Sequence, residues 1–243
     1  MYEKRAVLFL DILGFKQLIQ DKKEDLILSA LEVPQHLQNQ SPFDGKTEMK
    51  ISAFSDSIAV SEVIKEDHIG VIRMMGYASY LWWKFFAKGV LTRGGIAVGD
   101  LRHKDGIIFG PAMNEAYELE SQVANYPRIA LSEDVRDRLI REVGSEYGHN
   151  ASMLQFGLDI MRRDFDGVDH VHVLGPAGSC PAELQPHKDA DPITGGKSFT
   201  SVELNQAKWA TVTEFLEHRP TSRRVASKYD WLSNYLTITK AKY

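Results

Sequence analysis

Two aspartates that lie far apart in the chain are the residues best suited to chemistry. Asp11 follows the apolar run at 6–10, and Asp56 lies between two short apolar segments at 50–54 and 57–61. Paired carboxylates are hard oxygen ligands, which suit Mg²⁺ or Mn²⁺ bound together with a polyphosphate. Each aspartate also has an ordinary interpretation, in which Asp11 caps a helix and Asp56 makes a hairpin turn.

The turn after Asp11 adds a feature that suits phosphate. Gly14 interrupts the apolar residues 12–15, and a helix is predicted to begin at Lys16. The free amides and the dipole at a helix N-terminus attract phosphate oxygens. The turn and the two aspartates therefore indicate one site for a metal-bound polyphosphate.

Alternating strands and helices must bring these residues together. Apolar patterns predict strands at 6–10, 50–54, 57–61 and 90–98, and helices at 16–34, ended by Pro34, and at 68–88. This β-α-β-β-α-β order predicts an α+β, ferredoxin-like core with a C-terminal helical extension. We expect the first strand to lie beside the second and the third, which would make Asp11 and Asp56 converge.

The rest of the chain predicts further elements around this core. A helix is expected at 110–124, a strand at 128–131, a helix capped by Ser132, a strand at 167–174 and two helices from 202 to 243 that are separated near Pro220. The helix after Ser132 is predicted to bury Val135, Leu139 and Ile140. We expect a catalytic domain at 1–176, followed at 177–243 by a loop and helices that pack on it or extend it.

Composition excludes several classes of protein. The 243 residues carry a net charge of −4, which argues against a dedicated nucleic-acid binder or a polymerase with a basic template surface. The one cysteine excludes an intramolecular disulfide framework. No apolar stretch is long enough to span a bilayer, and no signal-peptide pattern follows the N-terminus, so we expect a soluble, cytoplasmic protein.

Five segments, in order along the chain, resemble the motifs of class III nucleotidyl cyclases. They are FLDILGF at 9–15, FSDS at 54–57, RGGIAVG at 93–99, GPAMNEA at 110–116 and PRIALS at 127–132. The first two resemble the family's metal-binding segments, the third its R-x-G-I-x-x-G strand and the fourth its G-x-x-x-N-x-A helix. Together they extend over about two-thirds of the chain, and their order is more specific than any one motif.

The resemblance implies a homodimer with composite active sites. Asp11, Asp56 and the carbonyl of Ile12 of one subunit would hold two Mn²⁺ or Mg²⁺ ions. The facing subunit would supply groups from the Arg93 strand and the Asn114 helix. The ribose 3′-hydroxyl would then attack the α-phosphorus, with Gly14 and Phe15 contributing to substrate binding.

Two departures from the family bear on the substrate. Purine-specific relatives read the base with a lysine and an aspartate, where this chain has Ser52 and Ile107. The family's helix arginine, four residues after Asn114, is replaced by Glu118, so Arg93 is the best candidate to oppose phosphate charge. The motifs are most similar to the bacterial pyrimidine cyclases of Pycsar antiphage defence, whose cyclic nucleotide activates a separate effector.

The resulting hypothesis is a cyclase that acts on UTP, less readily on CTP. Two alternatives stay open: a catalytically inactive cyclase-like domain that binds nucleotide, which Glu118 favours, and a purine cyclase with unusual base contacts. Arg93 could also be a surface residue, and Asn114 an ordinary helix residue. We expect the basic residues 102–104 to form a solvated turn.

Overall fold

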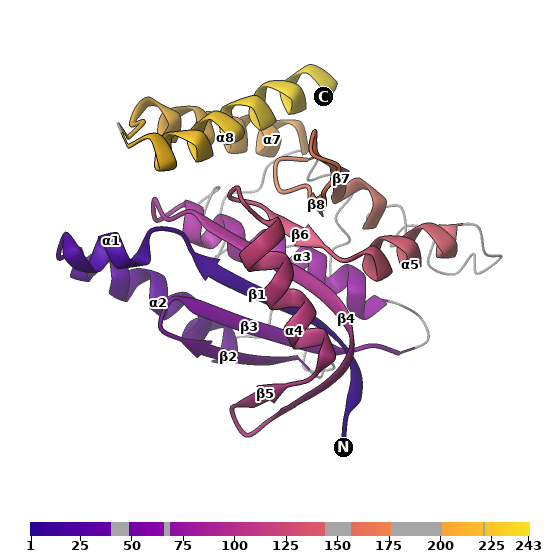
Figure 1. Ribbon diagram of the computed structural model, residues 1–243. Helices are drawn as coiled ribbons and strands as arrows, with labels where there is room; N and C mark the ends of the chain where they lie inside the picture. The colour runs from indigo at the N-terminus through magenta and orange to yellow at the C-terminus, as the bar shows by residue number, and fades with distance from the viewer. Residues whose placement is uncertain (40–48, 66–68, 144–156, 176–200, 221) are drawn as a thin grey trace.

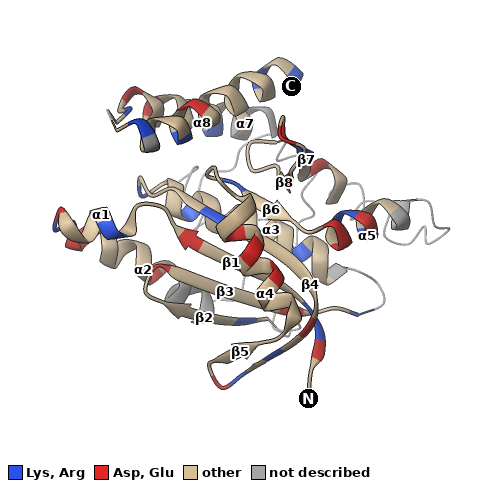
Figure 2. Ribbon diagram, viewed as in Figure 1, with Lys and Arg blue, Asp and Glu red and all other residues tan. Residues whose placement is uncertain are grey.

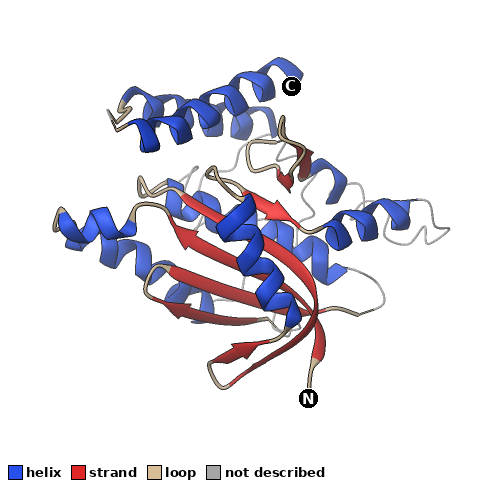
Figure 3. Ribbon diagram, viewed as in Figure 1, coloured by secondary structure: helices blue, strands red, loops and turns tan. Residues whose placement is uncertain are grey.

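The computed structural model describes the chain except residues 40–48, 66–68, 144–156, 176–200 and 221. Its centre is an antiparallel sheet of β1 (Glu3–Ile12), β2 (Lys50–Phe54), β3 (Ser57–Val63) and β4 (Thr92–Lys104), in the spatial order β2-β3-β1-β4. This is the strand order of a ferredoxin-like core, so the predicted α+β fold is confirmed (Figure 3). The sequence predicted that the first strand lies beside the second and the third. β1 does pair with β3, but its other neighbour is β4 and not β2.

The sheet continues on the β4 side with strands that extend the core. β6 (Ile129–Leu131) pairs parallel with β4, and β8 (Asp169–Val171) and β7 (Met161–Arg163) follow it. β5 (Ile107–Phe109) folds back on the end of β4 as a hairpin that lies near β2 (Figure 1). The sequence analysis predicted neither β5 nor β7, each of which has three residues.

The first predicted helix is two helices. α1 (Phe15–Gln20) is followed by its C-cap Asp21, and α2 (Glu24–Asn39) begins after a turn in which Lys22 has a positive φ of 52°. Pro34 lies inside α2 and does not end it, contrary to the prediction. A proline removes one backbone N–H, and here that loss does not terminate the helix.

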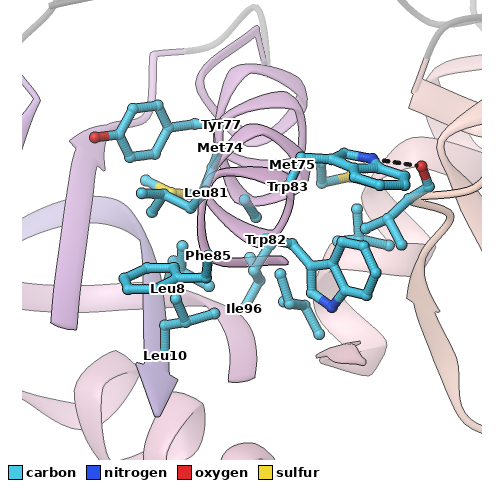
Figure 4. Packing of buried hydrophobic residues seen from close by; sticks show 14 of the residues in the cluster. Leu8, Leu10, Met74, Met75, Tyr77, Leu81, Trp82, Trp83, Phe85 and Ile96 are labelled. Carbon is cyan, nitrogen blue, oxygen red and sulfur yellow. Dashed lines mark hydrogen bonds between the residues drawn. The ribbon is translucent and has the colours of Figure 1, made fainter. Parts of the chain in front are cut away.

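The hydrophobic core lies on one face of the sheet. α3 (Ile69–Phe86) packs its aromatic residues against alternate residues of β1, including Leu8 and Leu10 (Figure 4). The indole of Trp83 donates a hydrogen bond of 3.0 Å to the carbonyl of Val173, beyond β8. The aromatic cluster of α3 is therefore core, as the sequence indicated.

The opposite face is covered in part by α4 (Pro111–Glu118) and the π-helical turn at Leu119–Val123, which lie across β1 and β4 (Figure 1). Val7, Ala97 and Leu101 pack there against Ala112 and Ala116. This second face also bears Asp11, because side chains two residues apart along a strand share a face. One face of the sheet therefore carries the main core, and the other carries a smaller apolar cluster together with Asp11.

The last helices share the core with the sheet. α5 (Glu133–Val143) starts at Ser132, whose hydroxyl accepts the amide of Val135 at 3.3 Å, but Ile140 is 52% exposed and not inward as predicted. α7 (Ser201–Glu217) and α8 (Arg223–Lys242) form the expected C-terminal pair. Trp231 and Tyr235 of α8 belong to the main core. Among the described helices, none is both long and apolar enough for a membrane span.

Candidate functional site

The two aspartates meet at one end of the central strands. Asp11 is the penultimate residue of β1 and lies opposite Ser57 of β3, while Asp56 is in the turn that leads into β3. The amide of Ile12 donates a 3.0 Å hydrogen bond to the carbonyl of Asp56, which fastens the turn to the end of β1. The sequence prediction that the two residues converge therefore agrees with the backbone geometry.

Arg93 lies beside these carboxylates in the same chain. It faces Asp11 across the β1–β4 ladder, and its Nε is 3.6 Å from the Asp11 carboxylate. The same Nε is 2.6 Å from Oε1 of Glu120, which is buried. The resemblance placed Arg93 across a dimer interface, whereas the structure places it next to the aspartates of its own subunit. Figure 2 shows acidic and basic positions of the ribbon close to one another where β1 ends beside α4.

The site carries more negative charge than Arg93 neutralises. Burial raises the pKa of Asp11, and the charge of Asp56 raises it further against the opposing effect of Arg93. Burial also raises the pKa of Glu120 to about 7, again against the attraction of Arg93 and with the charges of Asp11 and Asp56 adding to the rise. A further cation would stabilise the charged carboxylates.

The donor set fits a hard cation that keeps other ligands. Asp11 and Asp56 offer carboxylate oxygens, and Ile12 offers a carbonyl at the same strand end. Within the described parts of the chain, no group of three or more histidine, cysteine or acidic side chains could hold a metal. Mg²⁺ and Mn²⁺ commonly complete their coordination with water and substrate phosphates, so two carboxylates are sufficient here.

The glycine turn is present, but its helix is short. Gly14 has a φ of +80° and precedes α1, which has six residues. Phe15 is buried in the core, so only its backbone remains for a ligand. The phosphate-binding contribution predicted for this helix N-terminus is correspondingly limited, because the macrodipole of one short helix is weak.

Ser52, at the position predicted to contact the substrate base, has a hydrogen-bond partner that the sequence did not indicate. Ser52 on β2 shares a 2.9 Å hydrogen bond with Nε2 of His103, whereas Ile107 is 61% exposed on β5. The predicted solvated turn at 102–104 is wrong, because these residues lie in β4 and His103 is buried. The β4–β5 hairpin folds over the sheet and brings His103 to β2, an arrangement that local sequence signals do not contain.

The helix that carries Asn114 exposes the two residues singled out by the sequence. Asn114 and Glu118 are exposed on α4. In the described part of the chain, no hydrogen bond or ion pair joins the side chain of Asn114 to Asp11, Asp56 or Arg93. A single subunit thus brings together the aspartates and Arg93 but leaves Asn114 outside that cluster.

Glu120 is a site residue that the sequence analysis missed. A spacing of four joins Ala112, Ala116 and Glu120, and all three residues are buried. Residues four apart share one face of a helix. A glutamate on the buried face is costly unless a group of opposite charge lies beside it. That group is Arg93.

Three solved structures resemble this fold. An adenylate/guanylate cyclase/hydrolase from Silicibacter pomeroyi is 18% identical, with 70% of this chain and 95% of that chain covered and a TM-score of 0.42. A class III adenylyl cyclase-like ATP-binding protein from Pseudomonas aeruginosa is 12% identical, with coverages of 65% and 40% and a TM-score of 0.40. A bacterial light-regulated adenylyl cyclase is 11% identical, with coverages of 87% and 57% and a TM-score of 0.38.

No family model matches the chain, and no curated protein matches it. The chain spans less than two-thirds of the length of the second and third of these structures. At such identities and TM-scores, a functional conclusion has to come from the residues of the site.

Proposed function

We propose that this protein is a nucleotidyl cyclase that converts UTP, and less readily CTP, to the 3′,5′-cyclic nucleotide and pyrophosphate. The observation that carries the proposal is the convergence of Asp11 and Asp56 at one strand end, with Arg93 beside them. This arrangement occurs within motifs that resemble those of class III cyclases. It offers hard ligands for a metal-bound triphosphate next to a cation that can face phosphate oxygens.

In this proposal Asp11, Asp56 and the carbonyl of Ile12 would hold two divalent cations. When bound, Mg²⁺ or Mn²⁺ lowers the pKa of a coordinated hydroxyl and neutralises phosphate charge. The ribose 3′-oxygen forms a bond to the α-phosphorus, the bond between that phosphorus and the β-phosphate oxygen breaks, and the hydroxyl proton passes to water. Arg93 orients the phosphates and opposes the charge that develops on them, while the backbone of Gly14 and Phe15 lines the phosphate end.

Homodimerisation would supply the remaining groups. The exposure of Asn114 on α4 supports a role toward a second subunit, because this side chain does not reach the carboxylates of its own chain. The proposed product acts as a second messenger on a separate effector in antiphage defence, in the cytoplasm. These points rest on the motif resemblance.

A second candidate function is an inactive nucleotide-binding domain. It is favoured by Glu118 at the position of the family's helix arginine, and by the engagement of Arg93 with Glu120. In that case UTP binds in a metal-dependent manner without turnover. A purine cyclase is the third possibility and is separated by the choice of substrate.

The test is a product assay on the purified protein with Mn²⁺ and each of ATP, GTP, CTP and UTP in separate reactions, read by mass spectrometry. We expect cyclic UMP as the main product and less cyclic CMP. A purine cyclic nucleotide as the main product would contradict the pyrimidine assignment, and metal-dependent UTP binding without any cyclic product would favour the inactive domain.

A further inference from the structure

A buried chain of hydrogen bonds leads from Arg5 to Ser52. Nε of Arg5 donates to Oγ of Ser61 at 3.0 Å, Ser61 Oγ lies 2.8 Å from Nδ1 of His103, and Nε2 of His103 lies 2.9 Å from Oγ of Ser52. Arg5, Ser61 and His103 are at most 3% exposed. Lys50 donates a 2.7 Å bond to the carbonyl of His103, which fixes the end of β4 over β2.

The direction of these hydrogen bonds follows from the donors available. Ser61 accepts the Arg5 N–H, so its own hydroxyl hydrogen is left for Nδ1 of His103. Nδ1 is therefore the acceptor, and Nε2 carries the ring proton and donates to Ser52; this tautomer is assigned from the network. Burial, together with the charges of Arg5 and Lys50, lowers the pKa of His103 to about 4, so the ring is neutral near pH 7.

Ser52 consequently has one hydrogen to offer to a ligand. Its oxygen accepts from His103, and its hydroxyl hydrogen remains available as a donor. Ser52 is only partly buried, and it lies on the sheet face that bears Asp11.

The distance from the aspartates suits a nucleotide. Ser52 pairs with Ala59, and Asp11 pairs with Ser57, two residues away on β3. Strand geometry then separates Ser52 from Asp11 by about 7 Å along the sheet and about 10 Å across it. A triphosphate held at Asp11 can therefore extend its base toward Ser52.

We propose that His103 is a positioning residue that makes Ser52 a hydrogen-bond donor to the carbonyl oxygen at position 4 of a uracil base. This inference rests on the proposed function and deepens it. Uracil has a carbonyl oxygen at position 4, where cytosine has an amino group, so a fixed donor favours UTP over CTP. Adenine carries an amino group at position 6, so a donor aimed at that exocyclic group also disfavours ATP.

The experiment compares kcat/KM for UTP and CTP in four variants. His103→Leu removes the donor, and Ser52→Ala removes the hydroxyl; each is expected to lower the UTP:CTP ratio by about tenfold. His103→Gln keeps an amide donor and is expected to retain most of the preference. Lys104→Ala changes an exposed residue next to His103 and is the matched control, with an unchanged ratio.

A double variant tests whether His103 acts through Ser52. In the Ser52→Ala background, His103→Leu is expected to change the ratio no further, because the hydroxyl that it orients is already absent. The proposal would be overturned if His103→Leu lowered the UTP:CTP ratio by a similar factor in the Ser52→Ala background. It would also be overturned if the folded single variant His103→Leu kept the ratio of the unaltered protein. Thermal unfolding of each variant identifies any that do not fold.

Binding separates this proposal from the proposed function. Calorimetry with Ca²⁺ measures the affinities for UTP and CTP without requiring turnover. If no nucleotide is cyclised, a binding preference for UTP that His103→Leu abolishes still supports the role of His103, although the cyclase proposal has failed. If cyclic UMP forms and the His103→Leu variant keeps the preference for UTP in both kcat/KM and binding affinity, the cyclase proposal stands and the role of His103 is refuted.

Discussion

At the scale of single residues, the site is a balance between carboxylates and one guanidinium. Arg93 contacts Glu120 at 2.6 Å and Asp11 at 3.6 Å, while Asp56 adds a third negative charge to the same end of the sheet. Without a bound cation, burial shifts the pKa values of Asp11 and Glu120 upward and so favours their neutral forms. The cluster therefore suits the binding of a cation. Substitutions of Asp11 and of Arg93 measure what each residue contributes to activity and to the free energy of unfolding.

Replacing Asp11 should remove activity without weakening the fold. The pKa of Asp11 is raised, so its charged form at pH 7 is less favourable in the folded than in the unfolded chain. Asp11→Asn is expected to leave the free energy of unfolding unchanged or higher by on the order of 1 kcal/mol in metal-free buffer. Urea unfolding measures this effect, and a loss of more than that amount would show that the Asp11–Arg93 contact stabilises the protein.

Removing Arg93 should instead cost stability, because Glu120 is left buried without its cation. Arg93→Ala is expected to lower the free energy of unfolding by about 1–3 kcal/mol. Adding Glu120→Gln should recover part of that loss, while cyclase activity stays low in both variants. If activity returns in the double variant, Arg93 serves only to neutralise Glu120 and does not contact the phosphates.

At the scale of elements, the close approach of α4 to β4 positions Glu120. A Cβ on Gly95 would lie 2.4 Å from the carbonyl oxygen of Ala116 and 2.5 Å from Cβ of Leu119. A Cβ on Gly99, on the same face of β4, would come no closer than 3.4 Å to Ala112. The end of α4 therefore depends on a glycine at 95 far more than at 99.

This contrast gives a matched pair of variants. Gly95→Ala is expected to cost about 1–3 kcal/mol of stability and to reduce activity, because the turn that carries Glu120 must move. Gly99→Ala should be close to neutral in both respects. Chemical denaturation and the product assay measure the two effects, and equal losses in the two variants would contradict this packing.

The sequence predicted those elements whose signal is local. The buried run at 6–10, the hairpin around Asp56 and the Ser132 cap all occur as expected, because apolar pattern and turn chemistry act within a few residues. The contacts of His103 with Ser52 and of Arg93 with Glu120 could not be predicted in this way. They depend on the bend of the β4–β5 hairpin and on the π-helical turn after α4, which tertiary packing determines.

At the scale of the whole molecule, the C-terminal helices are joined to the sheet through buried polar groups. Nδ1 of His172 is 2.7 Å from the hydroxyl of Tyr235, and Trp231 donates a 2.6 Å bond to Asp164. Burial, together with the neighbouring His170 and Arg162, lowers the pKa of His172 to about 3. Attachment of α8 therefore requires a neutral ring at 172.

This requirement predicts that acid weakens the fold. Between the ordinary histidine pKa of about 6.5 and the native value, the unfolded chain binds a proton that the folded chain does not, so stability is full above pH 6.5 and falls below it. From pH 7.5 to 5, His172 should account for a loss of about 2 kcal/mol. Over the same pH range, the His172→Gln variant should lose about 2 kcal/mol less of its free energy of unfolding than the unaltered protein. Urea unfolding at pH 7.5 and at pH 5 measures this difference, and an equal loss in the two proteins would refute the prediction.

The most direct measurement of the central claim is the stoichiometry of UTP turnover with Mn²⁺ in the unaltered protein, Asp11→Asn and Asp56→Asn. We predict one pyrophosphate for each cyclic UMP, and a loss of about a hundredfold or more in both variants while their thermal unfolding remains cooperative. Cyclic UMP formed at undiminished rates by both folded variants would contradict the assignment of the paired aspartates as the catalytic metal site.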